Sequence, residues 1–229
     1  MTGRTVGRTF ADPRSLVFWV ILGLAAYGVL QLAPLVVEIT ADYPGASLLA
    51  AVLWAVSGLA LLLLLLRRIE LFERRSPVSI FGAFLWGAAV AAGIAAVSSG
   101  AISGIVARVI GGEADSGLVG AIAAAVYEEP LKMLGVVALP LIPGSRIVSA
   151  LDGLFFGLTV GLGFEVTESS LNTAKASADE FGSIEMVIVI FVPRDFIGGL
   201  WSHSTYTGIT GAGVGYFFDR TRPRGRRIL

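Results

Sequence analysis

Apolar runs long enough to cross a lipid bilayer occupy most of this chain. Five of them are clear, near 16–37, 47–66, 78–106, 118–139 and 149–171. A helix needs about 20 predominantly apolar residues to span the hydrocarbon core, where its backbone polar groups must be bonded within the helix. The 55% hydrophobic content and the mean hydropathy of +0.81 agree with such runs. The sequence therefore predicts an all-α, polytopic bundle of transmembrane helices.

The C-terminal stretch 184–218 decides the number of spans. It holds either two short spans, or an interfacial or re-entrant segment at 184–193 followed by one helix from about 195 to 218. Basic residues gather in alternate loops, which the positive-inside rule places in the cytoplasm. Those residues are Arg4, Arg8, Arg14, Arg67, Arg68, Arg74, Arg75 and Arg146. Six spans keep the arginines after Phe218 on the same side, so we expect six spans and both termini in the cytoplasm.

Composition limits the domain organisation and the partners. Six helices use most of the 229 residues, so we expect one membrane domain over 1–229 that ends in a basic cytoplasmic tail at 219–229. The 17 basic and 17 acidic residues balance, and this balance gives no indication of a nucleic acid partner. Cysteine is absent, which excludes disulfides, thiolate metal ligands and a cysteine nucleophile.

Two adjacent carboxylates, Glu128 and Glu129, lie in the fourth apolar run. A charged side chain at the centre of a bilayer costs roughly 2.5 to 3.5 kcal/mol, so this pair indicates shared protons, a bound cation or chemistry. Lys132 follows three and four residues later, where its ammonium can neutralise either acid. Pro130 leaves the carbonyl of Val126 without its helical partner, which suits a site open to water. The alternative is a helix-internal ion pair that only neutralises charge.

Two further acids, Glu165 and Glu168, lie in the fifth apolar run, about 5 to 10 Å from its expected outer end. They continue a stripe of glycines on one helix face, so we expect them to face protein rather than lipid. The stripe consists of Gly153, Gly157 and Gly161. The alternative is an interfacial position where both carboxylates are hydrated. Asp152 has a structural explanation, because Ser149 and Asp152 form a capping-box pattern at a helix start.

The last apolar run contains the only histidine of the chain. His203 and Thr207 are four residues apart on one helix face, so an imidazole and a hydroxyl point in one direction. Such a pair can stabilise an oxyanion. Arg194 precedes this run and is expected to anchor it at the interface while facing the acids. By helical rise, Glu128, Glu165, Glu168 and His203 all fall in the outer half of the bilayer.

Three motifs together resemble the PrsW family of intramembrane proteases, which is related to the CAAX-processing and bacteriocin-processing membrane proteases. They are Glu128-Glu129-Pro-Leu-Lys132, the segment from Asp152-Gly153 to Phe164-Glu-Val-Thr-Glu168, and Arg194 with His203-Ser-Thr-Tyr-Thr207. The resemblance covers about residues 118–218, the expected protease-like core. It implies hydrolysis of a peptide bond in a membrane-anchored protein or peptide, within or beside the bilayer.

We expect a glutamate mechanism, in which the catalytic set is Glu128, Glu129, Lys132, Glu168, His203 and Thr207. Glu128 or Glu129 acts as the general base that deprotonates water, while the other acid and the nearby lysine tune its proton affinity. Glu168 orients the water, and His203 with Thr207 stabilises the oxyanion. Glu165 and Arg194 are expected to contact the substrate.

The expected mechanism requires no metal, but a rival version uses a divalent cation such as zinc. Glu129, Glu168 and His203 would hold it, and the cation would neutralise part of the carboxylate charge. We favour the metal-free version slightly, because a single histidine makes a poor zinc site.

The resemblance also implies a substrate and a location. PrsW is similar in acting on membrane-anchored anti-sigma factors, so the resemblance makes such a factor one candidate partner, and a single-pass membrane protein or a lipid-anchored peptide is equally compatible. The expected location is the lipid bilayer of the bacterial cytoplasmic membrane. Two other classes of function compete with a protease. The buried carboxylates could carry protons or cations with His203 as a relay, although no internal repeat is visible. A non-catalytic relative would bind membrane proteins without cutting them.

Overall fold

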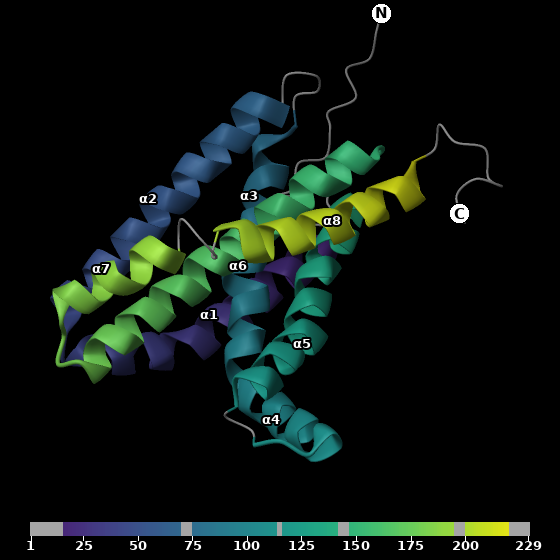
Figure 1. Cartoon of the computed structure of the whole chain (residues 1–229). Coiled ribbons are helices and arrows are strands. Elements are labelled where there is room, and N and C mark those ends of the chain that lie inside the picture. The colour runs from purple at the N-terminus through teal and green to yellow at the C-terminus, as the bar shows by residue number, and fades with distance from the viewer. Residues whose placement is uncertain (1–15, 70–74, 114–115, 142–146, 195–199, 220–229) are drawn as a thin grey trace, which may run out of the picture.

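The computed structural model describes residues 16–69, 75–113, 116–141, 147–194 and 200–219, and every regular element in these ranges is helical (Figure 1). The elements are α1 (Leu16–Ala41), α2 (Pro44–Ile69), α3 (Pro77–Leu85), η1 (Trp86–Ala91), α4 (Ala92–Ile110), α5 (Gly117–Ala138), η2 (Leu139–Leu141), α6 (Ala150–Asp179), α7 (Ile184–Pro193) and α8 (Leu200–Phe218). The predicted all-α polytopic bundle is confirmed.

Four helical stretches are long and apolar enough to cross a membrane. They are Leu16–Ala41, Pro44–Arg68, Pro77–Ile110 and Ala150–Asp179. The charged α5 and the glycine-rich α8 both pack against α6, and the ten-residue α7 coincides with the segment expected to be interfacial. The termini, Arg74, Arg146 and 195–199 lie outside the described residues. The count of six spans and their orientation therefore stay predictions.

The third span contains a π-helical segment that the sequence analysis does not anticipate. The run predicted at 78–106 is one continuous helix in which α3 passes through η1 into α4. A π-helical turn carries one residue more than an α-turn and is often found at functional sites. Here η1 packs against α6, and a side chain at Gly87 would collide with the backbone of Val160. This segment brings α4 close to the middle of α6.

Helix α6 begins as the sequence predicts. Ser149 Oγ accepts a hydrogen bond from the Asp152 amide at 3.1 Å, and Asp152 Oδ2 accepts one from the Ser149 amide at 3.2 Å. Arg75, from the segment before α3, adds an ion pair to Asp152 Oδ1 at 2.6 Å. The structural role expected for Asp152 is therefore confirmed.

The end of α6 differs from the prediction. The apolar run stops near 171, but the helix continues to Asp179 because its later polar residues are buried and bonded. Trp54 Nε1 donates a hydrogen bond to Thr173 Oγ1 at 3.0 Å, and Ser177 Oγ donates one to the Ser183 carbonyl at 2.8 Å. Glu165 therefore lies about 21 Å from the end of α6, so the expected distance of 5 to 10 Å from the helix end is wrong.

Helix α6 lies at the centre of the fold, and α8 runs antiparallel alongside it (Figure 1). The expected packing role of the glycines is confirmed, because Gly157 lies against the backbone of Thr207 and Gly161 against the backbone of His203. A Cβ at either glycine would collide with a main-chain carbonyl oxygen of α8. Small residues at such a crossing allow two backbones to approach closely. This contact fixes the depth of His203 relative to the acids of α6.

Candidate active site

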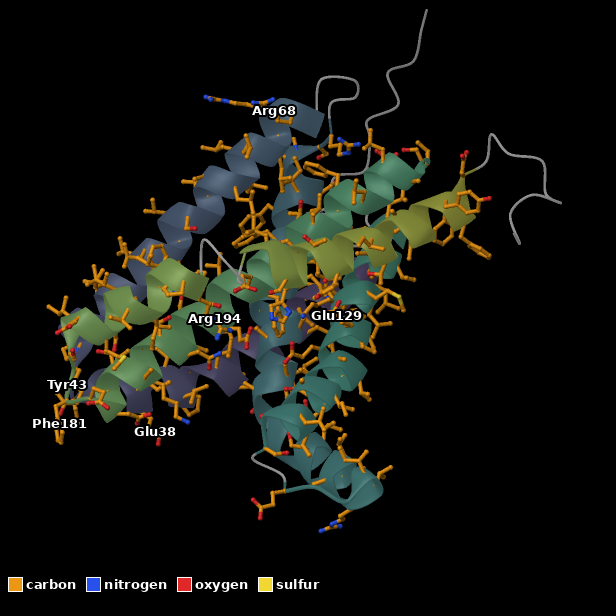
Figure 2. The ribbon with its side chains drawn as sticks, in the orientation of Figure 1. Glu38, Tyr43, Arg68, Glu129, Phe181 and Arg194 are labelled. Carbon is orange, nitrogen blue, oxygen red and sulfur yellow. The ribbon has the colours of Figure 1, made fainter. Side chains whose placement is uncertain are left out.

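The predicted polar residues of three helices meet at one place in the fold. Helix α5 contributes Glu128, Glu129 and Lys132, α6 contributes Glu165 and Glu168, and α8 contributes His203 and Thr207. In Figure 2 the labelled Glu129 and Arg194 lie near the middle of the bundle. The structure thus brings together, at short range, residues that are separated by as much as 79 positions in sequence.

Lys132 is the buried cation of this cluster and has no exposed surface. Its Nζ donates to Glu129 Oε1 at 2.8 Å and to Glu128 Oε2 at 3.3 Å, as the sequence spacing predicts. It also contacts His203 Nδ1 and lies 3.9 Å from the centre of the Phe164 ring. A buried ammonium needs such compensation, because desolvation of an unpaired charge costs several kcal/mol. Lys132 therefore fixes the positions of both α5 carboxylates.

His203 lies between two pairs of acids. Its Nδ1 faces α5, at 3.8 Å from Glu128 Oε2 and 3.7 Å from Glu129 Oε1. Its Nε2 faces α6, at 3.2 Å from Glu168 Oε2 and 3.7 Å from Glu165 Oε2. Four carboxylates thus surround one imidazole. Lys132 contacts the two acids on the α5 side, and Arg194 lies near Glu168 on the α6 side, so each side holds two carboxylates and one cation.

The two α6 carboxylates are each held by one oxygen. Ser169 Oγ donates to Glu165 Oε1 at 2.6 Å, and Asn172 Nδ2 donates to Glu168 Oε1 at 3.1 Å. Arg194 Nε donates to Ser169 Oγ at 3.1 Å, and Arg194 Nη2 lies 3.6 Å from Glu168 Oε1, so this arginine faces the acids as expected. Among the described residues, the buried Oε2 atoms of Glu165 and Glu168 accept no hydrogen bond.

Glu165, Glu168 and His203 have the arrangement of a metal-binding triad. One ligand atom from each lies within 4.8 Å of the others. Two carboxylate oxygens and an imidazole nitrogen suit a divalent cation such as zinc, and catalytic zinc sites use three protein ligands. The hydrogen bonds to both Oε1 atoms are the outer contacts that orient metal ligands. These residues therefore fit a divalent cation, with Glu165 in the position expected for Glu129.

Thr207 is buried and donates a hydrogen bond to Glu129. Its Oγ1 donates to Glu129 Oε2 at 3.2 Å, while Lys132 binds Glu129 Oε1, so both oxygens of this carboxylate are engaged. In this structure the hydroxyl is directed at Glu129, and the oxyanion role expected for His203 and Thr207 stays a prediction. Glu165 has no exposed surface, and the substrate contact expected for it stays a prediction.

A cleft of about 340 Å³ opens beside the cluster, between α1, α4, α5 and α6. Its lining residues are Leu35, Ile39, Ala92, Ala95, Ala96, Ser99, Tyr127, Glu128, Phe164, Glu168, Leu171, Asn172 and Lys175. Of the two adjacent α5 acids, Glu128 reaches this cleft and Glu129 does not. Glu128 and Glu168 therefore face a common space into which water and a substrate can enter.

Several residues that hold the acids or their helices in place were not predicted from the sequence. Ser169 and Asn172 follow the two α6 acids by four positions, a spacing that could have revealed them. Trp86 in η1 donates through Nε1 to the Leu131 carbonyl at 3.0 Å, within the α5 motif. Thr167 of α6 donates to the Ala88 carbonyl of η1 at 3.0 Å. The π-helical segment thus connects the two acidic helices, and no local signal in the sequence indicates these long-range contacts.

Comparison with known proteins places this site in a family. No curated protein and no solved structure matches the chain. The model of the PrsW family intramembrane metalloproteases matches residues 75–229, which is about two thirds of the chain. The match begins well before the expected core at 118–218, so it includes α3, η1 and α4 as well as the three helices of the site. The protein is therefore an integral membrane peptide hydrolase with protein substrates in the membrane, and the chain belongs to the PrsW family of intramembrane metalloproteases.

Proposed function

We propose that the cleft between α1, α4, α5 and α6 is where the enzyme hydrolyses a peptide bond of a membrane-anchored protein. The observation that carries this proposal is that Glu128 and Glu168 line one cleft while His203 lies behind both of them. Cleavage of a peptide bond requires removal of a proton from water and protonation of the departing amine. A carboxylate that faces a space open to water can do both.

In this proposal Glu128 is the general base. It accepts a proton from the attacking water and returns it to the amine nitrogen as the carbon–nitrogen bond breaks. Lys132 holds Glu128 through Oε2, and Thr207 with Lys132 holds Glu129 as a fixed negative neighbour. Glu129 becomes a positioning residue, because both of its oxygens are engaged. The base is thereby assigned to one member of the adjacent pair.

We propose further that Glu165, Glu168 and His203 hold a divalent cation. The two Oε2 atoms without a hydrogen bond and the description of the family as metalloproteases support this version over the metal-free one. When bound, such a cation acts as a Lewis acid that polarises the carbonyl and activates water. Ser169 and Asn172, which hold the two Oε1 atoms, would orient the carboxylates for such an ion, and Lys132 pairs with both carboxylates on the α5 side of the imidazole.

The finer assignments of substrate and orientation belong to the same proposal. The buried position of the cluster in the bundle supports cleavage within the membrane or close to its surface. A membrane-anchored anti-sigma factor is a substrate of the required kind. The charge pattern of the loops predicts that both termini lie in the cytoplasm of a bacterial cell. With this orientation the cluster would lie in the outer half of the bilayer.

The test compares cleavage of single-pass membrane proteins by wild type and by Glu128→Gln in detergent or liposomes. Loss of a general base lowers the rate by about 10²- to 10⁴-fold. Glu185→Gln is the matched control, because Glu185 is an exposed carboxylate in the first turn of α7. Equal rates for wild type and Glu128→Gln would refute the assignment of the base. Wild type that cleaves no substrate but conducts ions would favour an ion-handling protein, and binding without cleavage would favour a non-catalytic relative.

A further inference from the structure

The candidate active-site cleft continues along α6 well beyond the acids. Five of its lining residues come from this helix, at spacings that place them on one face. They are Phe164, Glu168, Leu171, Asn172 and Lys175. At a rise of 1.5 Å per residue the stripe is about 16 Å long, and Lys175 lies about 10 Å from Glu168 along the helix axis. The cleft therefore extends from the acids toward the C-terminal end of α6.

The opposite walls are apolar or small. Helix α4 contributes Ala92, Ala95, Ala96 and Ser99, and α1 contributes Leu35 and Ile39. A peptide bond inside a helix has its carbonyl engaged in the helical hydrogen bond, so a hydrolysed segment must be unwound. An extended chain advances about 3.3 Å per residue, and about three residues would cover the distance from Glu168 to Lys175.

Lys175 differs from the two cations near the acids. Lys132 and Arg194 are engaged with carboxylates, whereas Lys175 is exposed and makes no hydrogen bond or ion pair with any residue that the structure describes. Its ammonium therefore lies beside the cleft without an ion pair to a carboxylate that the structure describes. A side chain of opposite charge on a bound substrate is the group that it can accept.

We propose that Lys175 selects substrates with an acidic residue about three positions from the scissile bond, on the side that lies toward the end of α6. This proposal rests on the proposed function, which places the scissile bond beside Glu128 and Glu168. An exposed ion pair contributes modestly, so we expect an acidic residue there to improve binding roughly threefold over its amide. The alternative is a lysine that only extends toward water and ignores the substrate.

The test measures binding rather than cleavage, so that it is independent of catalysis. Glu128→Gln protein in detergent is titrated with labelled single-pass peptides that carry one Asp, Asn or Lys at each of the first six positions after the apolar segment. The expected result is tightest binding for Asp at one position, loss of that preference in Lys175→Ala, and preference for Lys in Lys175→Glu. The change from Lys175 to Glu should alter the Asp-to-Lys affinity ratio about tenfold.

Arg108→Glu is the matched control, because Arg108 is an exposed cation near the end of α4 and does not line the cleft. It should leave the peptide preference unchanged. The inference is overturned if Lys175→Ala and Lys175→Glu keep the wild-type preference, if Arg108→Glu changes it equally, or if none of the peptides binds. Charge-dependent binding without cleavage by wild type would instead refute the proposed function and leave the binding role of Lys175 standing.

Discussion

Two places on α6 bury carboxylates in different ways. At its start, Asp152 accepts hydrogen bonds on both oxygens, from Arg75 on Oδ1 and from the Val148 and Ser149 amides and the Ser149 hydroxyl on Oδ2. In its middle, Glu165 and Glu168 each have one oxygen held and one without a hydrogen bond among the described residues. A buried carboxylate with all its partners stabilises the fold. A buried carboxylate with an oxygen that accepts no hydrogen bond can still bind a ligand such as a cation.

The largest expected effect is on stability at the start of α6. Asp152→Ala should lower the free energy of unfolding in detergent by about 3 to 5 kcal/mol, because it removes the ion pair between two buried side chains, Asp152 and Arg75, and half of a capping box. Unfolding by denaturing detergent, followed by circular dichroism, measures the loss. A variant as stable as wild type would show that the matched carboxylate is not structural.

Removal of divalent metal should affect the site formed by Glu165, Glu168 and His203 and not the capping box at the start of α6. A chelator is expected to lower the rate of hydrolysis about a hundredfold or more, because the Lewis acid stabilises the transition state by several kcal/mol. It should leave the unfolding of the helix bundle nearly unchanged. Addition of one divalent cation should restore the rate. Full activity in chelator, with no metal in the purified protein, would contradict the metal-dependent version and favour the metal-free glutamate mechanism.

Ser169→Ala tests the role of the α6 carboxylates without removing one, because it deletes only the hydrogen bond that holds Glu165. Ser169 Oγ holds Glu165 Oε1 and accepts from Arg194. Loss of such an outer contact commonly weakens metal binding by about 10- to 100-fold. Titration of the purified protein with zinc measures this change. Ser170→Ala is the matched control, because that hydroxyl donates only to the Val166 carbonyl of its own helix; equal effects of the two variants would contradict the assignment.

The smallest expected effect concerns the π-helical segment. Trp86→Phe removes the hydrogen bond to the Leu131 carbonyl, at a cost of about 1 kcal/mol, and should lower hydrolysis severalfold by loosening the α5 motif. Trp54→Phe also removes a buried hydrogen bond, to Thr173, but lies away from the cleft lining. Activity per folded molecule should fall in the first variant only. A similar fall in both would mean that general destabilisation causes it.

Much of the fold and of the site could be predicted from local patterns. The apolar runs predicted the helices, and the spacing of Glu128, Glu129 and Lys132 predicted their ion pairs. The glycine stripe predicted close helix packing, which the structure shows between α6 and α8. Each of these depends on residues within a few positions or on one helix face. Such relations follow from helical geometry alone.

Contacts between helices account for what the sequence did not predict. The hydroxyl of Thr207 donates a hydrogen bond to Glu129. Glu165, rather than Glu129, completes the candidate metal-binding triad with Glu168 and His203, because the close packing of α6 and α8 determines which side of the imidazole faces each helix. The continuation of α6 past 171 depends on Trp54, which lies 119 positions away from Thr173. No periodicity within one helix contains this information.

The central claim is that Glu165 and Glu168, each with one oxygen that accepts no hydrogen bond from the described residues, hold the ion needed for hydrolysis, whereas Asp152, bonded on both oxygens, serves only the fold. Its most direct test is single-turnover cleavage of one membrane-anchored substrate by Glu168→Gln and by Asp152→Asn, each normalised to folded protein. The account predicts a rate at least about a hundredfold lower for Glu168→Gln and nearly unchanged for Asp152→Asn. Equal rates in the two variants, or a larger loss in Asp152→Asn, would contradict it.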